Sequence, residues 1–205
     1  MAVNRPAHFE TPELRIDKLT VGPFENNVFI LRSKGTGAAT LLDAANEHDL
    51  LLEVSRATGV RRVLTTHGHW DHIQAVEAVR DAGIDVGIAP EDASMLPSYD
   101  FTIPDDDVIE VGDLRLRTIH TPGHTAGSTC FLLEGHPVLF SGDTLFPGGP
   151  GNTSLPGGDF NQIIESIDRR LFSLPDDLLV LPGHGLDTTL DTERPHLQEW
   201  IDRGW

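Results

Sequence analysis

The sequence predicts an α+β fold, in which helices cover β-sheets, and three observations support this class. Segments of β character alternate with helical hydrophobic spacing along the whole chain of 205 residues. Antiparallel hairpins recur around short, glycine-containing turns. Hydrophobic residues make up 39% and charged residues 23% of the chain, which is ordinary globular usage. Because the chain has neither a repeat nor a linker, we expect a single domain over residues 1–205.

The first predicted elements are a hairpin and a helix. Asn27–Leu31 has the apolar run of a buried strand, and Thr40–Asp43 is its expected partner across the Gly35–Gly37 turn. Asn46 is expected to cap the helix that follows, and Gly59 to end it.

A strand–helix–strand unit comes next. Arg62–Thr66 has the pattern of a short apolar strand that runs into a polar cluster. Ile73–Ala82 has helical spacing and is followed by Gly83, a residue that commonly ends helices. Val86–Ala89 is the next predicted strand.

Two hairpins, an amphipathic helix, a strand and a terminal helix complete the prediction. In chain order they are Val108–Ile119, Ser128–Leu133 with Pro137–Phe140, Phe160–Leu171, Leu178–Leu181 and Thr192–Ile201.

The charge balance excludes several classes of partner. Lys plus Arg number 15 against 32 for Asp plus Glu, which gives a net charge of −17 with neutral histidines. Because a chain this acidic repels phosphate backbones and anionic lipids, neither nucleic acid nor a membrane is an expected partner. No apolar run approaches the roughly 20 residues that span a bilayer, and the first residues lack the apolar stretch of a secretory signal. With Cys130 as the lone cysteine, a cytoplasmic protein is expected.

The strongest chemical signal is THGHWDH, residues Thr66–His72. His67 and His69 are two positions apart, so they can project from the same side of an extended backbone. Asp71 and His72 lie where the chain turns into the next predicted helix. Imidazole and carboxylate together suit zinc, iron or manganese. Four candidate ligands within six positions argue against a polar loop with incidental histidines.

Three further motifs each place one candidate ligand after a predicted strand or in a tight turn. HTPGHTAGS offers His124, FSGDTLF offers Asp143, and LPGHG offers His184. Each motif alone is ordinary turn chemistry. Together they predict one metal centre, since loops at strand ends are where the active sites of layered folds gather.

Other features are assigned plainer roles. Pro147–Gly158 is rich in glycine and is either a flexible loop or the lip of a pocket; it is no P-loop, because no Gly-Lys-Ser/Thr follows. His120 is expected to be structural or to support a ligand, and Cys130 to be a core residue. Tyr99 and Phe146 are candidates for the pocket wall.

The order, spacing and flanks of these motifs resemble the metallo-β-lactamase superfamily and, within it, the glyoxalase II (hydroxyacylglutathione hydrolase) branch. The resemblance runs from about Asn27 to the end of the chain, and Trp70 also resembles glyoxalase II. It implies a four-layer αβ/βα sandwich with metals at one edge of two sheets. Only 21 residues follow His184, so the chain resembles the short form, without the helical domain that holds glutathione in long forms.

The resemblance also implies a role for each candidate ligand. Two divalent metal ions are the expected cofactors, zinc foremost, with iron or manganese as alternatives. Asp143 would bridge the two ions. The remaining ligands would be His67, His69 and His124 for the first ion, and Asp71, His72 and His184 for the second.

This chemistry suits thioester hydrolysis. A metal-bridging hydroxide would be the nucleophile, since zinc lowers the pKa of bound water to about 7, and Asp71 and Asp143 would be the catalytic carboxylates that hold the metals. A thiolate, of parent pKa about 8.5, leaves without obligatory protonation, whereas an amide nitrogen needs an acid that the motifs do not offer. The expected substrate is a small-molecule thioester of the S-2-hydroxyacyl-thiol type.

Two alternatives stay open. A mononuclear-iron persulfide dioxygenase is similar around His67 and His124, and metal stoichiometry would distinguish it. A lactonase or β-lactamase of the same superfamily would differ in its substrate pocket. A serine hydrolase is disfavoured because no G-x-S-x-G motif occurs, and a purely metal-binding protein is disfavoured by the complete ligand set.

Overall fold

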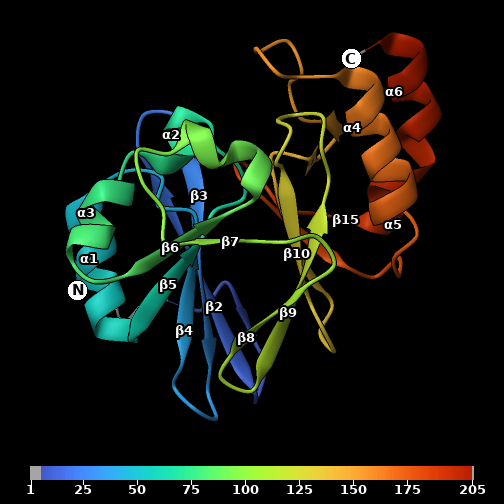
Figure 1. Cartoon of the computed structure of the whole chain (residues 1–205). Coiled ribbons are helices and arrows are strands. Elements are labelled where there is room, and N and C mark those ends of the chain that lie inside the picture. The colour runs from blue at the N-terminus through green and yellow to red at the C-terminus, as the bar shows by residue number, and fades with distance from the viewer. Residues whose placement is uncertain (1–5, 205) are drawn as a thin grey trace.

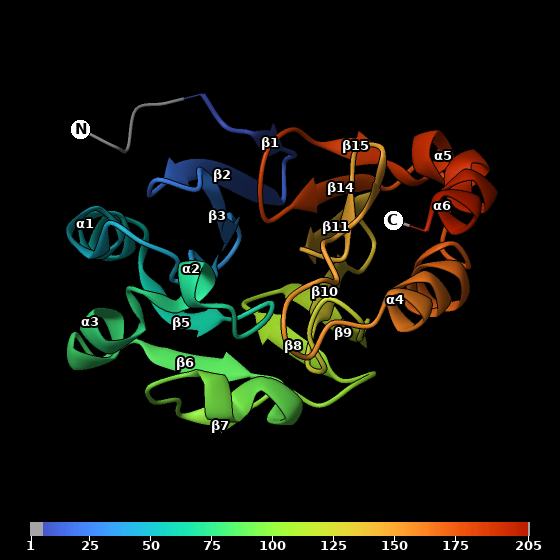
Figure 2. The same ribbon diagram turned by 90° about the horizontal axis from the view of Figure 1, so that it is seen from above.

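The computed structural model of the chain describes residues 6–204. Two β-sheets pack face to face, and helices cover the outer face of each, so the molecule has four layers (Figure 1). The view from above shows α1 and α3 on one side and α4 to α6 on the other, with both sheets between them (Figure 2). The predicted α+β class and the four-layer αβ/βα sandwich are therefore confirmed.

The first sheet holds seven strands in the order β1-β2-β3-β4-β5-β6-β7. Pairing is antiparallel from β1 to β4 and parallel from β4 to β7. The strands are β1 Phe9–Glu10, β2 Leu14–Val21, β3 Asn26–Ser33, β4 Ala39–Leu42, β5 Val60–Leu64, β6 Asp85–Ile88 and β7 Phe101–Thr102.

The second sheet holds six strands in the order β15-β14-β11-β10-β9-β8. Its one parallel pair is β11 with β14. The strands are β8 Val108–Val111, β9 Leu114–His120, β10 Thr129–Leu133, β11 Val138–Gly142, β14 Leu179–Pro182 and β15 Thr188–Thr189; β12 Leu145–Phe146 and β13 Gly149–Pro150 form a separate pair.

The helices fall into two groups along the chain. The first group is α1 His48–Thr58, α2 Trp70–Ile73 and α3 Val76–Asp81, followed by a 3-10 helix, Pro90–Met95. The second is α4 Phe160–Ser166, which continues as a wider π turn, Ile167–Leu171, then α5 Leu190–Glu193, a 3-10 turn Arg194–His196 and α6 Leu197–Arg203. Within residues 6–204, no helix is both long and apolar enough to cross a membrane.

Three apolar clusters hold the layers together. One joins the first sheet to α1 and α3, where Leu41 and Val63 meet Leu51 and Val79. The second fills the space between the sheets and includes Phe131 and Phe140. The third, which includes Trp200, joins the second sheet to α4 and α6. The fully buried side chains of these clusters supply the main stabilising free energy, about 1.5–3 kcal/mol for each large apolar residue.

Each strand and hairpin that the sequence predicted is present, with shifts of a few residues at the ends. Strand β2 was not predicted, although Leu14 and Ile16 point into the space between the sheets and Leu19 and Val21 to the opposite face. The change of face within one strand breaks the simple period of two that identifies a half-buried strand.

Three helix predictions need correction. The single helix expected over Ile73–Ala82 is two helices, because the N–H groups of Gln74 and Ala75 donate to the carbonyls of Ala45 and Ala44 instead of continuing the helical pattern. The predicted cap of α1 at Asn46 is wrong. Glu47, at φ 51°, precedes the helix, and the Asn46 amide instead donates to Gln74 Oε1 at 2.7 Å.

The predicted terminal helix, Thr192–Ile201, is interrupted by the 3-10 turn at residues 194–196. Pro195 lies in this turn, and it has no N–H to donate to an earlier carbonyl. After this turn, α6 covers the second sheet as a separate helix. The first helical segment, α5, begins earlier than predicted, at Leu190.

Candidate metal centre

The structure brings all seven predicted ligand residues together at one edge of the two sheets. Their donor atoms form two groups of three, His67, His69 and His124 in the first and Asp71, His72 and His184 in the second, and a linking set of His67, His72 and Asp143 joins them. Within each set the donor atoms lie within 4.8 Å of one another. The segments that supply them are the loop after β5 (His67 and His69), helix α2 (Asp71 and His72), the β9–β10 connection (His124), the loop after β11 (Asp143) and the loop after β14 (His184).

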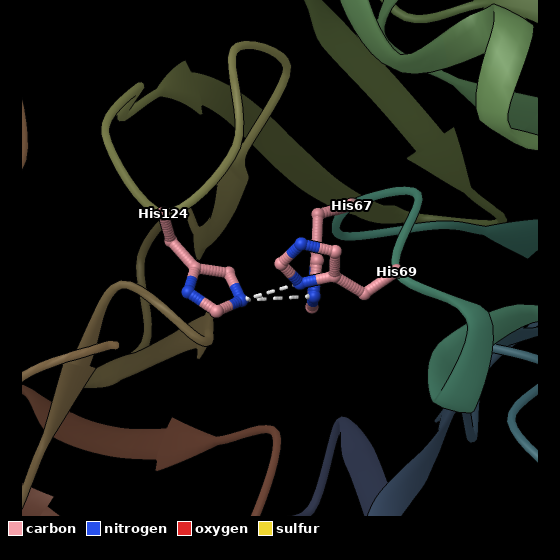
Figure 3. A group of neighbouring side chains, drawn as sticks. All are labelled: His67, His69 and His124. Atoms are coloured by element: carbon pink, nitrogen blue, oxygen red, sulfur yellow. Dashed lines mark hydrogen bonds between the residues drawn. The ribbon is translucent and has the colours of Figure 1, made fainter. Parts of the chain in front are cut away.

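The first group is a trio of imidazoles whose ring nitrogens converge (Figure 3). Nε2 of His124 lies 2.8 Å from Nδ1 of His69 and 3.2 Å from Nε2 of His67. A neutral imidazole has one N–H and one lone pair, so three such nitrogens at one point cannot all be satisfied by one another. A cation such as Zn²⁺, which takes several imidazole nitrogens, fits this donor set.

The second group combines two imidazoles with a carboxylate. Nε2 of His184 lies 3.1 Å from Nε2 of His72 and 3.2 Å from Oδ2 of Asp71. The amide of Asn26, at the start of β3, donates to the same Asp71 oxygen at 2.9 Å. This mixed nitrogen and oxygen set also suits a divalent transition metal.

Asp143 lies between the two groups. Its Oδ2 is 3.6 Å from Nε2 of His124 and 3.6 Å from Nε2 of His184, and its Oδ1 is 3.4 Å from Nε2 of His72. Oδ1 is buried without a hydrogen-bond partner among the described residues. A buried carboxylate oxygen in that state is costly unless a cation is coordinated there, so Asp143 fits a ligand shared by two ions.

The ring nitrogens that face away from the centre are also engaged. Nδ1 of His124 donates to the Asn152 carbonyl at 2.6 Å, and Nδ1 of His184 donates to the Phe24 carbonyl at 2.9 Å. Such outward partners fix the tautomer and the ring orientation of a metal-binding histidine. Asn152 and Phe24 could not be predicted from the sequence, because every residue type has a main-chain carbonyl.

Asp43 supports histidines of both groups. Its buried carboxylate accepts from Nδ1 of His72 at 2.8 Å and from the Thr66 hydroxyl at 2.8 Å. That hydroxyl lies 3.1 Å from Nδ1 of His67 and can accept a hydrogen bond from it. Asp43 has a φ of 62°, an uncommon conformation for a residue other than glycine. Backbone strain of this kind often occurs at functional sites.

Asp92, on the 3-10 helix Pro90–Met95, ties two ligand loops together. Its carboxylate accepts from the Gly68 N–H at 2.9 Å, between His67 and His69. It also accepts from the Thr125 hydroxyl at 2.6 Å and the Gly127 N–H at 2.7 Å, just after His124. Its position 20 or more residues from every motif explains why the sequence did not reveal it.

Two glycines permit the close packing of the centre. A Cβ on Gly183 would lie 2.2 Å from Oδ1 of Asp143 and 2.8 Å from Cε1 of His72. A Cβ on Gly151 would lie 1.8 Å from the Asp143 carbonyl oxygen. Gly151 belongs to the Pro147–Gly158 segment, so this segment lies against the centre.

The pKa shifts of these side chains differ between the two groups. Against the effect of burial, nearby carboxylates raise the pKa of His72 and His184, so metal binding to the second group would displace protons. Burial lowers the pKa of His67 well below its ordinary value, which keeps a lone pair available. Burial alone would raise the pKa of Asp143, but the nearby charge of His72 holds it below its ordinary value. The pKa of Asp71 is lowered in the same way, burial being outweighed by its histidine and Asn26 contacts. Neutral imidazoles and ionised carboxylates are the forms that bind metals.

The residues given plainer roles lie outside this cluster. The His120 ring approaches the Ile103 carbonyl at 3.3 Å, a structural contact. Cys130 is buried in the third apolar cluster, and burial raises the pKa of its thiol to about 11. The ring of Phe146 lies 6.5 Å from that of His184, and Tyr99 is an exposed surface residue.

Comparison with known proteins agrees with this geometry. Residues 21–184 match the family model described as the Metallo-beta-lactamase superfamily. Hydroxyacylglutathione hydrolase GloC of Haemophilus influenzae is 29% identical over 203 residues, which cover 88% of this chain and 95% of GloC.

Solved structures of different descriptions share the fold. BLEG-1, a B3 metallo-β-lactamase, has a TM-score of 0.80 at 28% identity, with 88% of this chain and 97% of that chain covered. ETHE1 from Myxococcus xanthus has a TM-score of 0.80 at 29% identity, with 89% and 82% covered. TTHA1623, solved in a di-iron-bound form, has a TM-score of 0.76 at 31% identity, with 86% and 96% covered.

Proposed function

We propose that this chain, which belongs to the metallo-β-lactamase superfamily, is a dinuclear metal-dependent hydrolase that cleaves thioesters of the S-2-hydroxyacyl-thiol type. The observation that carries the proposal is the position of Asp143. It contacts His124 of the first group and both histidines of the second, and one of its oxygens has no hydrogen-bond partner. This is the arrangement needed to hold two cations side by side.

The seven ligand residues would be divided between two metal ions. His67, His69 and His124 would hold one ion, and Asp71, His72 and His184 the other, with Asp143 shared. When bound, two such ions supply a hydroxide nucleophile at neutral pH and a Lewis acid for the carbonyl. The hydrogen bonds of Asp43, Asn152 and Phe24 keep the imidazoles in one orientation, so no reorganisation is needed when substrate binds.

A thioester is the substrate whose cleavage requires the fewest catalytic groups besides the metals. Its thiolate leaves without a proton, since the parent thiol has a pKa of about 8.5. The relative GloC is named a hydroxyacylglutathione hydrolase, which supports the 2-hydroxyacyl group and thioester chemistry. Zinc is the proposed metal, with iron and manganese as alternatives, and TTHA1623 in its di-iron-bound form supports the count of two.

Thiol release and metal content, measured on one preparation, test the proposal. The purified protein is assayed with a small thioester panel that includes S-D-lactoylglutathione, and its metals are counted by mass spectrometry. We expect thiol release with two ions per chain, and loss of most metal and activity in Asp143→Ala with the circular dichroism spectrum unchanged. Full activity of Asp143→Ala would contradict the shared-ligand assignment.

A persulfide dioxygenase is the second candidate, favoured by the likeness to ETHE1. It would use one iron, which a set of two histidines and one carboxylate, such as His67, His124 and Asp143, would hold. Absence of thiol release together with one iron per chain, and oxygen uptake with a persulfide, would favour this candidate over the hydrolase. The likeness to BLEG-1 adds a β-lactam and a lactone to the substrate panel.

A further inference from the structure

Large exposed hydrophobic side chains gather around the metal centre. Seven are exposed among residues 6–204, and five of these belong to segments that build the centre. We call these five the apolar rim: Phe24, Trp70, Met95, Leu155 and Leu186. Single exposed apolar residues are normal on a protein surface, but their concentration on the segments that build a polar metal centre indicates a binding surface.

The core of the rim is an aromatic pair. The rings of Phe24 and Trp70 lie 5.1 Å apart in an edge-to-face arrangement, yet they are 53% and 58% exposed. Trp70 lies between His69 and Asp71 in sequence, and the Phe24 carbonyl accepts from His184. The pair therefore stands at the second ligand group and presents apolar surface to solvent.

The other members are fixed to the centre through neighbouring residues. Met95 packs against Gly68, between His67 and His69. Leu186 follows His184 by two positions and is 80% exposed. Leu155 is three residues beyond Asn152, whose carbonyl holds His124.

The positive charge of Lys18, beside this region, is already engaged. Lys18 is the lysine that reaches the loop after His184, and its ammonium donates to the Gly185 carbonyl at 2.9 Å and pairs with Asp187 at 3.0 Å. Glu25, beside Phe24, adds a negative charge at the surface. A thiol that carries carboxylates, such as glutathione, gains little from such surroundings.

We propose that the apolar rim binds the thiol half of the substrate, and that this thiol is apolar or aromatic. This inference rests on the proposed function. Because a 2-hydroxyacyl group is small and polar, the thiol is the part of the thioester large enough to cover the aromatic pair. Aromatic rings stack edge-to-face or offset with other rings, so a benzylic thiol matches Phe24 and Trp70.

A matched pair of thioesters tests the proposal. The same D-lactoyl group is offered on benzyl mercaptan and on glutathione to the metal-loaded protein. We expect kcat/KM for the benzyl thioester to exceed that for the glutathione thioester about tenfold or more. Phe24→Ala should raise KM for the benzyl thioester about tenfold and raise KM for the glutathione thioester less, since the ring is lost and the Phe24 carbonyl that holds His184 is retained.

Ile201→Ala is the matched control, because Ile201 is a similarly exposed apolar residue on α6, outside the rim. Binding is measured separately with 1-(benzylthio)propan-2-one, an analogue whose extra CH₂ between sulfur and carbonyl prevents thioester cleavage. It should change the fluorescence of Trp70, with no such change in Trp70→Phe and weaker binding in Phe24→Ala.

The outcomes separate this inference from the proposed function. Equal or better hydrolysis of the glutathione thioester, with KM unaffected by Phe24→Ala, would overturn the inference and leave the hydrolase intact. Absence of all thiol release, with analogue binding that Phe24→Ala weakens, would support the rim as a binding surface and overturn the thioester hydrolase.

Discussion

The carboxylate of Asp43 accepts a 2.8 Å hydrogen bond from Nδ1 of His72, and both side chains are almost completely buried. The same carboxylate also accepts from the N–H and the hydroxyl of Thr66, and this hydroxyl contacts His67. One acceptor at the end of β4 thus orients a histidine in each ligand group. A change at Asp43 should therefore affect both metals together.

Replacing Asp43 with Asn tests this coupling. The amide has one acceptor oxygen for three donors and places its own N–H₂ against one of them. We expect metal affinity and activity to fall about 10- to 100-fold, the usual cost of losing an outward partner of a metal-binding histidine. Chelator competition measures the affinity. Asp100→Asn is the control, since Asp100 accepts from Val86 and pairs with Arg80 instead. Wild-type affinity in Asp43→Asn would show that His72 does not depend on this bond.

Two adjacent threonines provide an internal comparison. Thr66→Val removes the hydroxyl that links Asp43 to His67, whereas the Thr65 hydroxyl is buried without a hydrogen-bond partner within residues 6–204. Thr66→Val should lower metal affinity. Thr65→Val should leave it unchanged and raise the free energy of unfolding slightly, because an unsatisfied buried hydroxyl is removed. Chemical denaturation and metal titration of the two variants measure both effects. Identical metal affinities would refute the role given to Thr66.

Asp92 is expected to position two ligand loops without touching a metal. Asp92→Asn would place an amide N–H₂ against one of three donors, from Gly68, Thr125 and Gly127. We expect loss of metal from the first ligand group with the second retained, and a free energy of unfolding lowered by about 1–3 kcal/mol. The d–d spectrum of the cobalt-substituted protein, which reports ligand geometry, distinguishes this from simple destabilisation. An unchanged spectrum would contradict a positioning role.

The close packing at Gly183 predicts a strong effect of one methyl group. In Gly183→Ala the new Cβ would be forced against Asp143 and His72, so both side chains must move away from the centre. We expect at least a 100-fold loss of activity and fewer than two metals per chain. Gly149→Ala is the matched control, since its Cβ would meet the flexible end of Arg203 at 3.3 Å and Nε1 of Trp200 at an ordinary contact distance of 4.0 Å. Normal metal content in Gly183→Ala would show that the centre adapts more easily than its packing indicates.

Alkaline stability should depend on Cys130. Burial raises the pKa of its thiol from 9.0 to about 11, so between these values the unfolded chain loses a proton that the folded chain keeps. Stability from this residue is therefore complete below pH 9 and declines as the pH rises toward 11, by about 3 kcal/mol in all. Denaturant titrations from pH 8 to 10.5 should show a steeper decline for the wild type than for Cys130→Ala. Parallel slopes would show that the thiol ionises equally in both states.

The sequence identified the seven side chains of the centre because each lies in a short, chemically distinctive motif. It did not identify the residues that orient them. Asp43 and Asp92 act through contacts with segments 20 or more residues away, and Phe24 and Asn152 act through main-chain carbonyls. Such roles depend on tertiary structure and have no local pattern.

The same distinction applies to the fold. Hairpins such as β10–β11 were predictable, because their pattern and turn are local. The division between α2 and α3 was not, since it results from hydrogen bonds to Ala44 and Ala45, about 30 residues earlier in the chain. Tertiary contacts of this kind routinely override helix propensity.

Neither ligand group is complete within one half of the sandwich. Within the first ligand group, His67 and His124 come from different sheets and are separated by 57 positions; within the second, His72 and His184 are separated by 112. Both sheets must form and dock before either group exists, and contacts this distant form slowly. Metal capture is therefore a late event in folding. The rate at which refolding protein takes up a metal would report the rate at which the two halves dock.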